Sequence, residues 1–203
     1  MTVLRDLPAV QVTRRGDDMI DQTRLDNAGF LAALHKLPPY DGITFRGLAR
    51  SEPAPSMVAA AAGVMASSHS ARVATENFTC STVLAVLNRS GRDISSFSPH
   101  PDEQEVVLRP GSVWRPLTTL RLRDPDLEVR ILEELDVTGV IHPPVAWGTT
   151  VEEVVRRVTR AIHNAGDDDP VPVRLVGKFA GPWVTSLPMP AQPEPRMRLH
   201  RLV

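Results

Sequence analysis

Two stretches of the chain place apolar residues at helical spacing. The first begins near Leu25 and is stopped by Pro38-Pro39. The second opens with a capping box formed by Thr150 and Glu153 and closes at Gly166. The apolar positions are Phe30, Leu31, Leu34 and Leu37 in the first stretch, and Val151, Val154, Val155, Val158, Ala161 and Ile162 in the second. The pattern therefore predicts one amphipathic helix near each end of the chain.

Short apolar runs between these helices are typical of strands. The predicted strands cover residues 43–48, 76–85, 92–97, 103–109, 112–122 and 127–135. Turn residues such as Pro110-Gly111 separate them. This spacing favours an antiparallel or mixed pair of sheets, and together with the helices it predicts an α+β fold.

Two further segments complete the prediction. Ser56 can cap a helix of small residues over 57–66, which would pack closely against a sheet. Residues 171–176 alternate between apolar and other positions, which predicts a strand after the second amphipathic helix. We therefore divide the chain into an N-terminal arm (1–24), a core (25–138), an αβ extension (139–181) and a proline-rich tail (182–203).

Composition excludes several classes of partner. The chain has 203 residues and a net charge of −1, so it offers no broad attraction for nucleic acid or for an anionic membrane. No stretch is long and apolar enough to cross a membrane, and the N-terminus lacks the pattern of a secretion signal. The single cysteine, Cys80, cannot form an internal disulfide. We expect synthesis in the cytoplasm, with any export by a route that needs no signal peptide.

Candidate metal ligands are scattered. The six histidines show no i, i+4 pair, and only one cysteine is available to help them. Three aspartates at 167–169 lie between Gly166 and Pro170, where a solvated turn explains them. The tripeptide Arg15-Gly16-Asp17 is likewise read as a turn. We expect no metal site.

A pair of carboxylates is the clearest candidate site. Glu103 and Glu105 stand directly before the apolar run 106–108. Side chains two apart on a strand share a face about 6.5 Å from each other, so both acids are expected to face one cleft. The alternative is a pair of solvated acids at the start of a strand.

Three other segments bear possible ligand-binding residues. Arg46 and Gly47 end the first predicted strand, Ser81 lies in the hydroxyl-rich run 78–82, and Phe97 precedes a turn. Arginine pairs with phosphate oxygens through two parallel hydrogen bonds, and glycine permits close approach of a ligand to the backbone. Each residue also has a structural reading: an edge-strand arginine, a serine in a polar strand, or a core phenylalanine.

The order of these motifs, arginine, serine and then the glutamate pair, resembles the arginine-serine-glutamate class of mono-ADP-ribosyltransferases. The resemblance spans about residues 28–135. It implies a split β-sandwich with short flanking helices, to which the αβ extension adds an appendage. The sequence departs from the family's Ser-Thr-Ser motif, because Cys80-Ser81-Thr82-Val83 keeps only two hydroxyls in either register. Tight contact with the ribose of the substrate is therefore in question.

The resemblance implies a role for each candidate residue. Glu105 would stabilise the ribose cation formed from NAD, and Glu103 would deprotonate the acceptor, commonly an arginine. Arg46 with Gly47 would bind the pyrophosphate. Ser81 would brace the nicotinamide ribose and position Glu105, and Phe97 would stack on nicotinamide or on the target.

The implied activity is NAD-dependent transfer of ADP-ribose to a protein side chain, with NAD as substrate. Such a protein is a glycosyltransferase and is often a bacterial toxin or effector. The spacing of the glutamates also suggests inversion at the anomeric carbon, by analogy with inverting glycosidases. Two alternatives stay open: an NAD glycohydrolase, and a catalytically degenerate binding or immunity-like module.

Overall fold

The computed structural model describes residues 28–48, 58–61, 63–135, 150–172, 174, 176–180 and, for the backbone only, 184–186. The chain divides into two compact units between Pro38 and Pro39. In the first unit residues 28–36 are helical, which confirms the first predicted helix over the part described. The predicted arm, with Arg15-Gly16-Asp17, lies outside the described residues.

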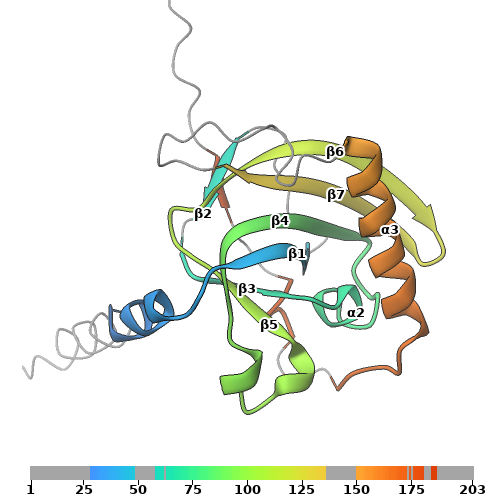
Figure 1. The fold of residues 1–203 in the computed structure, drawn as a ribbon. Coiled ribbons are helices and arrows are strands. Elements are labelled where there is room, and N and C mark those ends of the chain that lie inside the picture. Colours follow the sequence, from blue (N-terminus) through green and yellow to red (C-terminus); the bar gives the residue numbers. More distant parts are fainter. Residues whose placement is uncertain are drawn as a thin grey trace, which may run out of the picture. The chain divides into compact units, whose positions relative to one another are not determined.

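The second unit is built on one eight-stranded sheet (Figure 1). Its strands are β1 (Tyr40–Gly47), β2 (Ala59–Ala61), β3 (Met65–Ser68), β4 (Thr82–Asp93), β5 (Glu105–Leu108), β6 (Val113–Arg123), β7 (Asp126–Leu135) and β8 (Val184–Ser186). Its helical elements are α2 (Ala71–Ala74), the 3₁₀ helices η1 (Ser95–Phe97) and η2 (Pro101–Glu103), and α3 (Val151–Asp167). The strand order is β1-β3-β5-β4-β7-β6-β2-β8, and β1 also pairs with β4.

Strand β4 is the centre of the sheet and is buried on both faces. Its odd-numbered residues Val83, Ala85 and Leu87 belong to one apolar cluster, whereas Leu84 and Val86 belong to another. Successive side chains of a strand point to opposite faces, so one apolar run supplies two cores.

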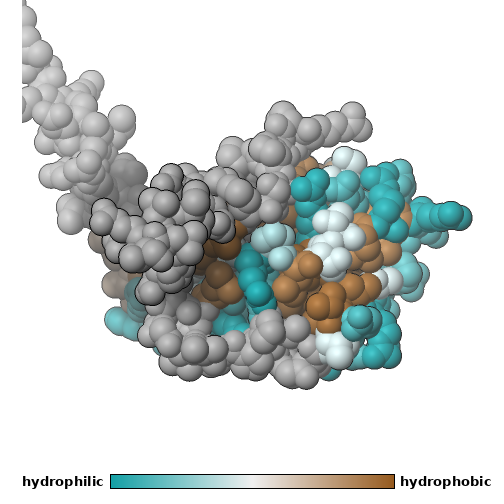
Figure 2. Space-filling model, turned by 90° about the horizontal axis from the view of Figure 1, so that it is seen from above, coloured by the Kyte–Doolittle hydropathy of each residue, from teal (hydrophilic) through white to brown (hydrophobic). Residues whose placement is uncertain are grey.

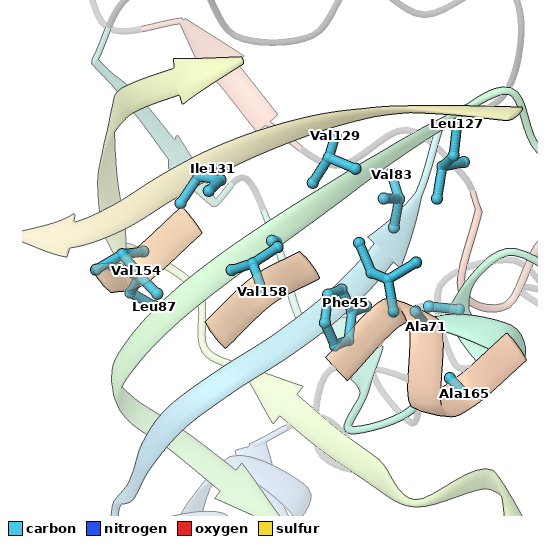
Figure 3. Packing of buried hydrophobic residues seen from close by; sticks show 13 residues of the cluster. Phe45, Ala71, Val83, Leu87, Leu127, Val129, Ile131, Val154, Val158 and Ala165 are labelled. Carbon is cyan, nitrogen blue, oxygen red and sulfur yellow. The ribbon is translucent and has the colours of Figure 1, made fainter. Parts of the chain in front are cut away.

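The first cluster lies between the sheet and the helices (Figure 3). It joins side chains of β1, β4 and β7 to α2 and to the apolar stripe of α3. The Thr150 side chain accepts a hydrogen bond from Glu153 N, as the capping box predicts. Arg72 of α2 donates to the carbonyl oxygens of Ala165 (2.7 Å) and Gly166 (2.5 Å) and so ties α2 to the C-terminal end of α3. The predicted second helix is confirmed, and it contributes to the main core, because its buried stripe needs an apolar partner.

The second cluster fills the space between the two parts of the folded sheet. Trp114, Leu108 and Leu132, from β6, β5 and β7, meet there. This cluster lies on the face of β4 opposite the helices, and the predicted α+β class with a split β-sandwich is confirmed. Seen from above, hydrophilic (teal) and hydrophobic (brown) residues both occur on the surface (Figure 2). Among the described residues, no helix is long and apolar enough to span a membrane.

Two local predictions were wrong. The helix expected over 57–66 is replaced, in the described residues, by β2 and β3, whose small residues pair with β6, β8, β1 and β5. The strand expected over 76–85 begins only at Thr82, after α2 and a turn. Tertiary pairing overrode the helical preference of alanine in one case. In the other, Glu76, Asn77 and Phe78 adopt positive φ in a turn after α2, which delays the start of the strand.

The remaining differences lie at the ends of elements. The strand predicted over 92–97 is the end of β4 followed by η1. The described residues between 171 and 176 form no strand. Within the predicted tail, Val184–Ser186 pairs with β2 in an antiparallel register and forms β8.

Candidate functional site

The glutamate pair lies at the junction of η2 and β5. Glu105 opens β5, as predicted, but Glu103 ends η2 and is not part of a strand. Between them Gln104 has φ 48° and ψ 48°, the left-handed conformation. A turn of the backbone, and not strand alternation, therefore directs both acids to one place.

Two serines of β3 hold this junction. In the β3–β5 ladder Ser68 lies opposite Glu105. The Ser68 hydroxyl donates to the carbonyl oxygen of Glu103, and the Ser67 hydroxyl donates to that of Val106, each at 2.8 Å. Both serines are fully buried. Since a buried carbonyl without a donor is costly, these bonds fix the backbone on either side of Gln104.

A single ammonium group joins the two carboxylates. Lys178 Nζ lies 2.5 Å from Glu103 Oε2 and 2.8 Å from Glu105 Oε2. The carboxylates are therefore closer together than the roughly 6.5 Å expected along a strand, and the predicted analogy with inverting glycosidases loses its geometric basis.

Burial makes this cluster electrostatically strong. Glu103 is only 6 % exposed. Burial alone would lower the pKa of Lys178, but the hydrogen bonds to Glu103 and Glu105 outweigh it, and the pKa lies above its ordinary value. The site thus holds a positive charge between two negative ones in a place with little solvent.

Arg46 lies on β1 beside the same segment. Its Nη1 donates to the carbonyl oxygens of Ala66 on β3 (2.6 Å) and Lys178 (3.2 Å). The Arg46 side chain is buried, with only 4 % of its surface exposed. The guanidinium therefore connects β1, β3 and the segment that bears Lys178.

Gly47 permits a close approach to its backbone, but the groups that approach it belong to the protein and not to a ligand. A Cβ atom at this position would lie 2.5 Å from the carbonyl oxygen of Ala74. It would also lie 3.1 Å from Cys80 Sγ and from Ala180 Cβ. Packing against α2 alone is sufficient to require glycine here.

Ser81 and Phe97 lie at exposed positions. Ser81 precedes β4, and its carbonyl oxygen accepts a hydrogen bond from Glu128 N of β7. It follows Cys80, whose Sγ is near Gly47, so it lies toward the arginine side of the site. Phe97 ends η1 with 72 % of its surface exposed, and the reading as a core phenylalanine is wrong.

Sequence reasoning missed three residues that contact the glutamates or their backbone. Ser67 and Ser68 follow directly after the helix that was predicted over 57–66, and the run Met65–Ser68 shows no alternation that would have identified a strand. Lys178 carries no local signal, because it lies 73 residues from Glu105 in the sequence. Within the described part of the chain, no three His, Cys, Asp or Glu side chains form a metal-binding group.

Comparisons with known proteins place this chain near bacterial ADP-ribosyltransferases in structure. The Vis toxin, an ADP-ribosyltransferase from Vibrio splendidus, is 21 % identical over 65 % of each chain, with a TM-score of 0.49. Exoenzyme S from Pseudomonas aeruginosa, solved with human 14-3-3 protein beta and carba-NAD, is 24 % identical over 66 % of this chain and 68 % of its own, with a TM-score of 0.44.

An ADP-ribosyltransferase from Clostridium botulinum is 14 % identical over 58 % of this chain and 70 % of its own, with a TM-score of 0.42. No family model matches the chain, and no curated protein matches it.

Proposed function

We propose that this protein is an NAD-dependent mono-ADP-ribosyltransferase. One observation carries the proposal: Glu103 and Glu105 converge on a single positively charged nitrogen at 2.5 and 2.8 Å. A place that holds a cation between two carboxylates is suited to the positive charge that develops on the ribose when NAD loses nicotinamide.

In the proposed reaction the bond between the ribose C1′ and the nicotinamide nitrogen breaks, and its electron pair leaves with nicotinamide. Glu105 accepts a hydrogen bond from a ribose hydroxyl and stabilises the cation on C1′. The acceptor nitrogen then bonds to C1′ and gives up a proton to Glu103. Both carboxylates must be ionised and free of Lys178 for these steps.

We further propose that the acceptor is an arginine of another protein. A planar guanidinium can donate two parallel hydrogen bonds to a carboxylate such as Glu103. Phe97, exposed on η1 next to η2, offers a ring on which nicotinamide or the target can stack. In this proposal the protein is a toxin or effector that acts on a partner protein, with neither nucleic acid nor membrane as a ligand.

The remaining site residues bind NAD in this proposal. Arg46 and Gly47 lie next to the pyrophosphate, and Ser81, exposed before β4, contacts the nicotinamide ribose. Ser68 replaces Ser81 as the residue that positions the glutamates, since Ser68 is bonded to the backbone of Glu103. Glu105 is the catalytic group, and Glu103 selects the acceptor.

Measurement of nicotinamide release tests the proposal. Purified protein is incubated with NAD, alone and with agmatine, which bears an arginine-like guanidinium and is bound in a solved structure of Vis. A transferase releases nicotinamide faster with agmatine and forms ADP-ribosylagmatine. Mass spectrometry of a lysate treated with labelled NAD then identifies the protein acceptor and the modified residue.

A rate that agmatine does not change would favour the glycohydrolase alternative, in which water is the acceptor. The binding-module alternative has one structural observation in its favour: Lys178 already occupies the glutamate pair. If calorimetry at millimolar NAD detects no binding, even by a Lys178→Gln variant that leaves the glutamate pair unoccupied, the enzymatic proposal fails and the module reading stands.

A further inference from the structure

Residues 176–180, here called the strap, cover most of the candidate site. Lys178 contacts both glutamates, its carbonyl oxygen accepts from Arg46, and Ala180 lies against Gly47. In Figure 1 the orange-red part of the chain passes close to β3 and β5. One short segment therefore touches the proposed acceptor, ribose and pyrophosphate positions at once.

Among the described residues, the strap leaves little room beside Glu103. A pocket lined in part by Glu103, Arg174 and Phe179 encloses only about 20 Å³, enough for a water molecule. Phe179 is buried and closes one side of this pocket. NAD cannot reach the glutamates through this pocket while the strap keeps this position.

The strap and the residues before it are fastened to the rest of the unit by polar contacts. The Asn77 side chain exchanges two hydrogen bonds with the backbone of Val171, at 2.8 and 3.0 Å. Gly177 N donates to Glu76 Oε1 (2.6 Å), and Arg174 pairs with Asp102 (2.7 Å). The turn at Glu76 and Asn77 and the 3₁₀ helix η2 therefore both hold the segment that leads into the strap.

The turn that provides two of these contacts is in an uncommon conformation. Glu76, Asn77 and Phe78 have φ of 52°, 62° and 62°, a region that residues other than glycine seldom adopt. Such a turn persists only when its surroundings hold it, and here it presents Glu76 and Asn77 to the C-terminal segment.

The charge of Lys178 opposes the chemistry proposed for the site. A positive group that donates to Glu105 neutralises the carboxylate that should face the developing ribose cation, and it occupies the position of a cationic acceptor at Glu103. Lys178 therefore places a positive charge where the proposed reaction needs the charge of its substrate.

We propose that the strap is an intrachain pseudosubstrate: Lys178 occupies the cation subsite of Glu103 and Glu105 and must be displaced before NAD and its acceptor bind. This inference rests on the proposed function, and it adds regulation to it. The competent form is then a minor population, and the apparent affinity for NAD is reduced by the fraction of molecules in that form.

Amine reactivity tests the contact in the unaltered protein. The chain has two lysines, Lys36 and Lys178, and Lys36 is exposed, so it is an internal reference. We expect an amine-acetylating reagent to modify Lys178 at least about tenfold more slowly than Lys36, and carba-NAD to remove most of this protection. Equal rates without ligand, or protection unchanged by bound carba-NAD, would overturn the proposal.

Substitution tests the consequence for binding. Lys178→Gln removes the charge and should tighten NAD binding about tenfold to a hundredfold in calorimetry, whereas Lys178→Arg keeps the charge and should change it little. Lys36→Gln is the matched control. Unchanged or weaker binding by a folded Lys178→Gln protein would overturn the strap, and the thermal melting of each variant verifies folding.

The two proposals fail in different ways. If wild type and Lys178→Gln both bind no NAD, the proposed function falls and the strap falls with it. If both bind NAD equally, only the strap is overturned. If Lys178→Gln does not fold, the acetylation rates of the wild type decide.

Discussion

Two groups of buried carboxylates in this protein obtain their partners in different ways. Glu133 on β7, 2 % exposed, accepts two hydrogen bonds from Arg115, at 2.7 and 2.9 Å, and pairs with Arg89 at 3.6 Å. Arg115 lies directly opposite it in the β6–β7 ladder. Glu103 and Glu105 instead obtain their cation from the strap, which belongs to no strand.

The difference separates an acid whose partner is placed by strand pairing from acids whose partner lies on the strap. The sheet register keeps the backbones of Arg115 and Glu133 opposite each other, so the partner stays at hand as long as the strands remain paired. Lys178 can withdraw by rotation of its own side chain, without breaking a ladder. A buried acid with an exchangeable partner is available to a ligand, and a buried acid with a fixed partner is not.

The largest expected effect is on catalysis. Glu105→Gln should lower kcat for nicotinamide release about 10²- to 10³-fold, because an amide carries no charge to stabilise the ribose cation. Glu133→Gln should leave kcat per folded molecule unchanged. Steady-state kinetics at saturating NAD measure kcat of both variants. If Glu105→Gln keeps more than a tenth of the wild-type kcat, Glu105 is not part of the mechanism.

The next effect is on stability, with the opposite ranking. Glu133→Ala should lower the free energy of unfolding by about 3 kcal/mol, since it leaves the Arg115 and Arg89 guanidinium groups without their carboxylate. Glu105→Ala should cost clearly less, because Lys178 keeps Glu103 as a partner. Urea denaturation measures both, and equal losses would contradict the distinction between fixed and exchangeable partners.

A smaller effect compares two serines. Ser68→Ala removes the donor to the buried Glu103 carbonyl and should destabilise the protein by about 1–3 kcal/mol while lowering kcat. Ser81→Ala, at an exposed position, should change stability by no more than about 0.5 kcal/mol. A loss of NAD affinity in Ser81→Ala at unchanged stability would show that Ser81 contacts the ligand.

The smallest effect concerns an exposed pair. Burial would raise the pKa of Asp93, but hydrogen bonds from Ser95 and His69 outweigh it and hold that pKa below its ordinary value. The ionised form therefore stabilises the fold above the unfolded-state pKa of about 3.9, and this stabilisation is lost as the pH falls through the lower folded-state pKa.

Asp93→Asn should thus cost no more than about 1 kcal/mol at neutral pH, and the difference from wild type should disappear in strong acid. Thermal melting across that pH range measures it. A larger cost than that of Glu133→Ala would reverse the comparison between exposed and buried acids.

The sequence by itself determined the elements whose apolar pattern is long and regular. The stripe of α3 with its cap, the apolar run of β4 and the strands β6 and β7 follow from residues close together in the chain. Glu105 before an apolar strand, and Arg46 with Gly47 at the end of another, were singled out as candidates from their order along the chain and the family resemblance that this order carries.

Only the tertiary structure decided which residues meet. Small residues such as Ala59–Ala61 and Met65–Ser68 suit helix and strand alike, and ladder partners far along the chain selected the strand. The left-handed Gln104 directs Glu103 out of the strand that its spacing suggested. Lys178 is separated from Glu103 by 75 positions in the sequence and from Glu105 by 73, and only the fold brings them together. No local pattern encodes such a contact, because its energy exists only after the strands have paired.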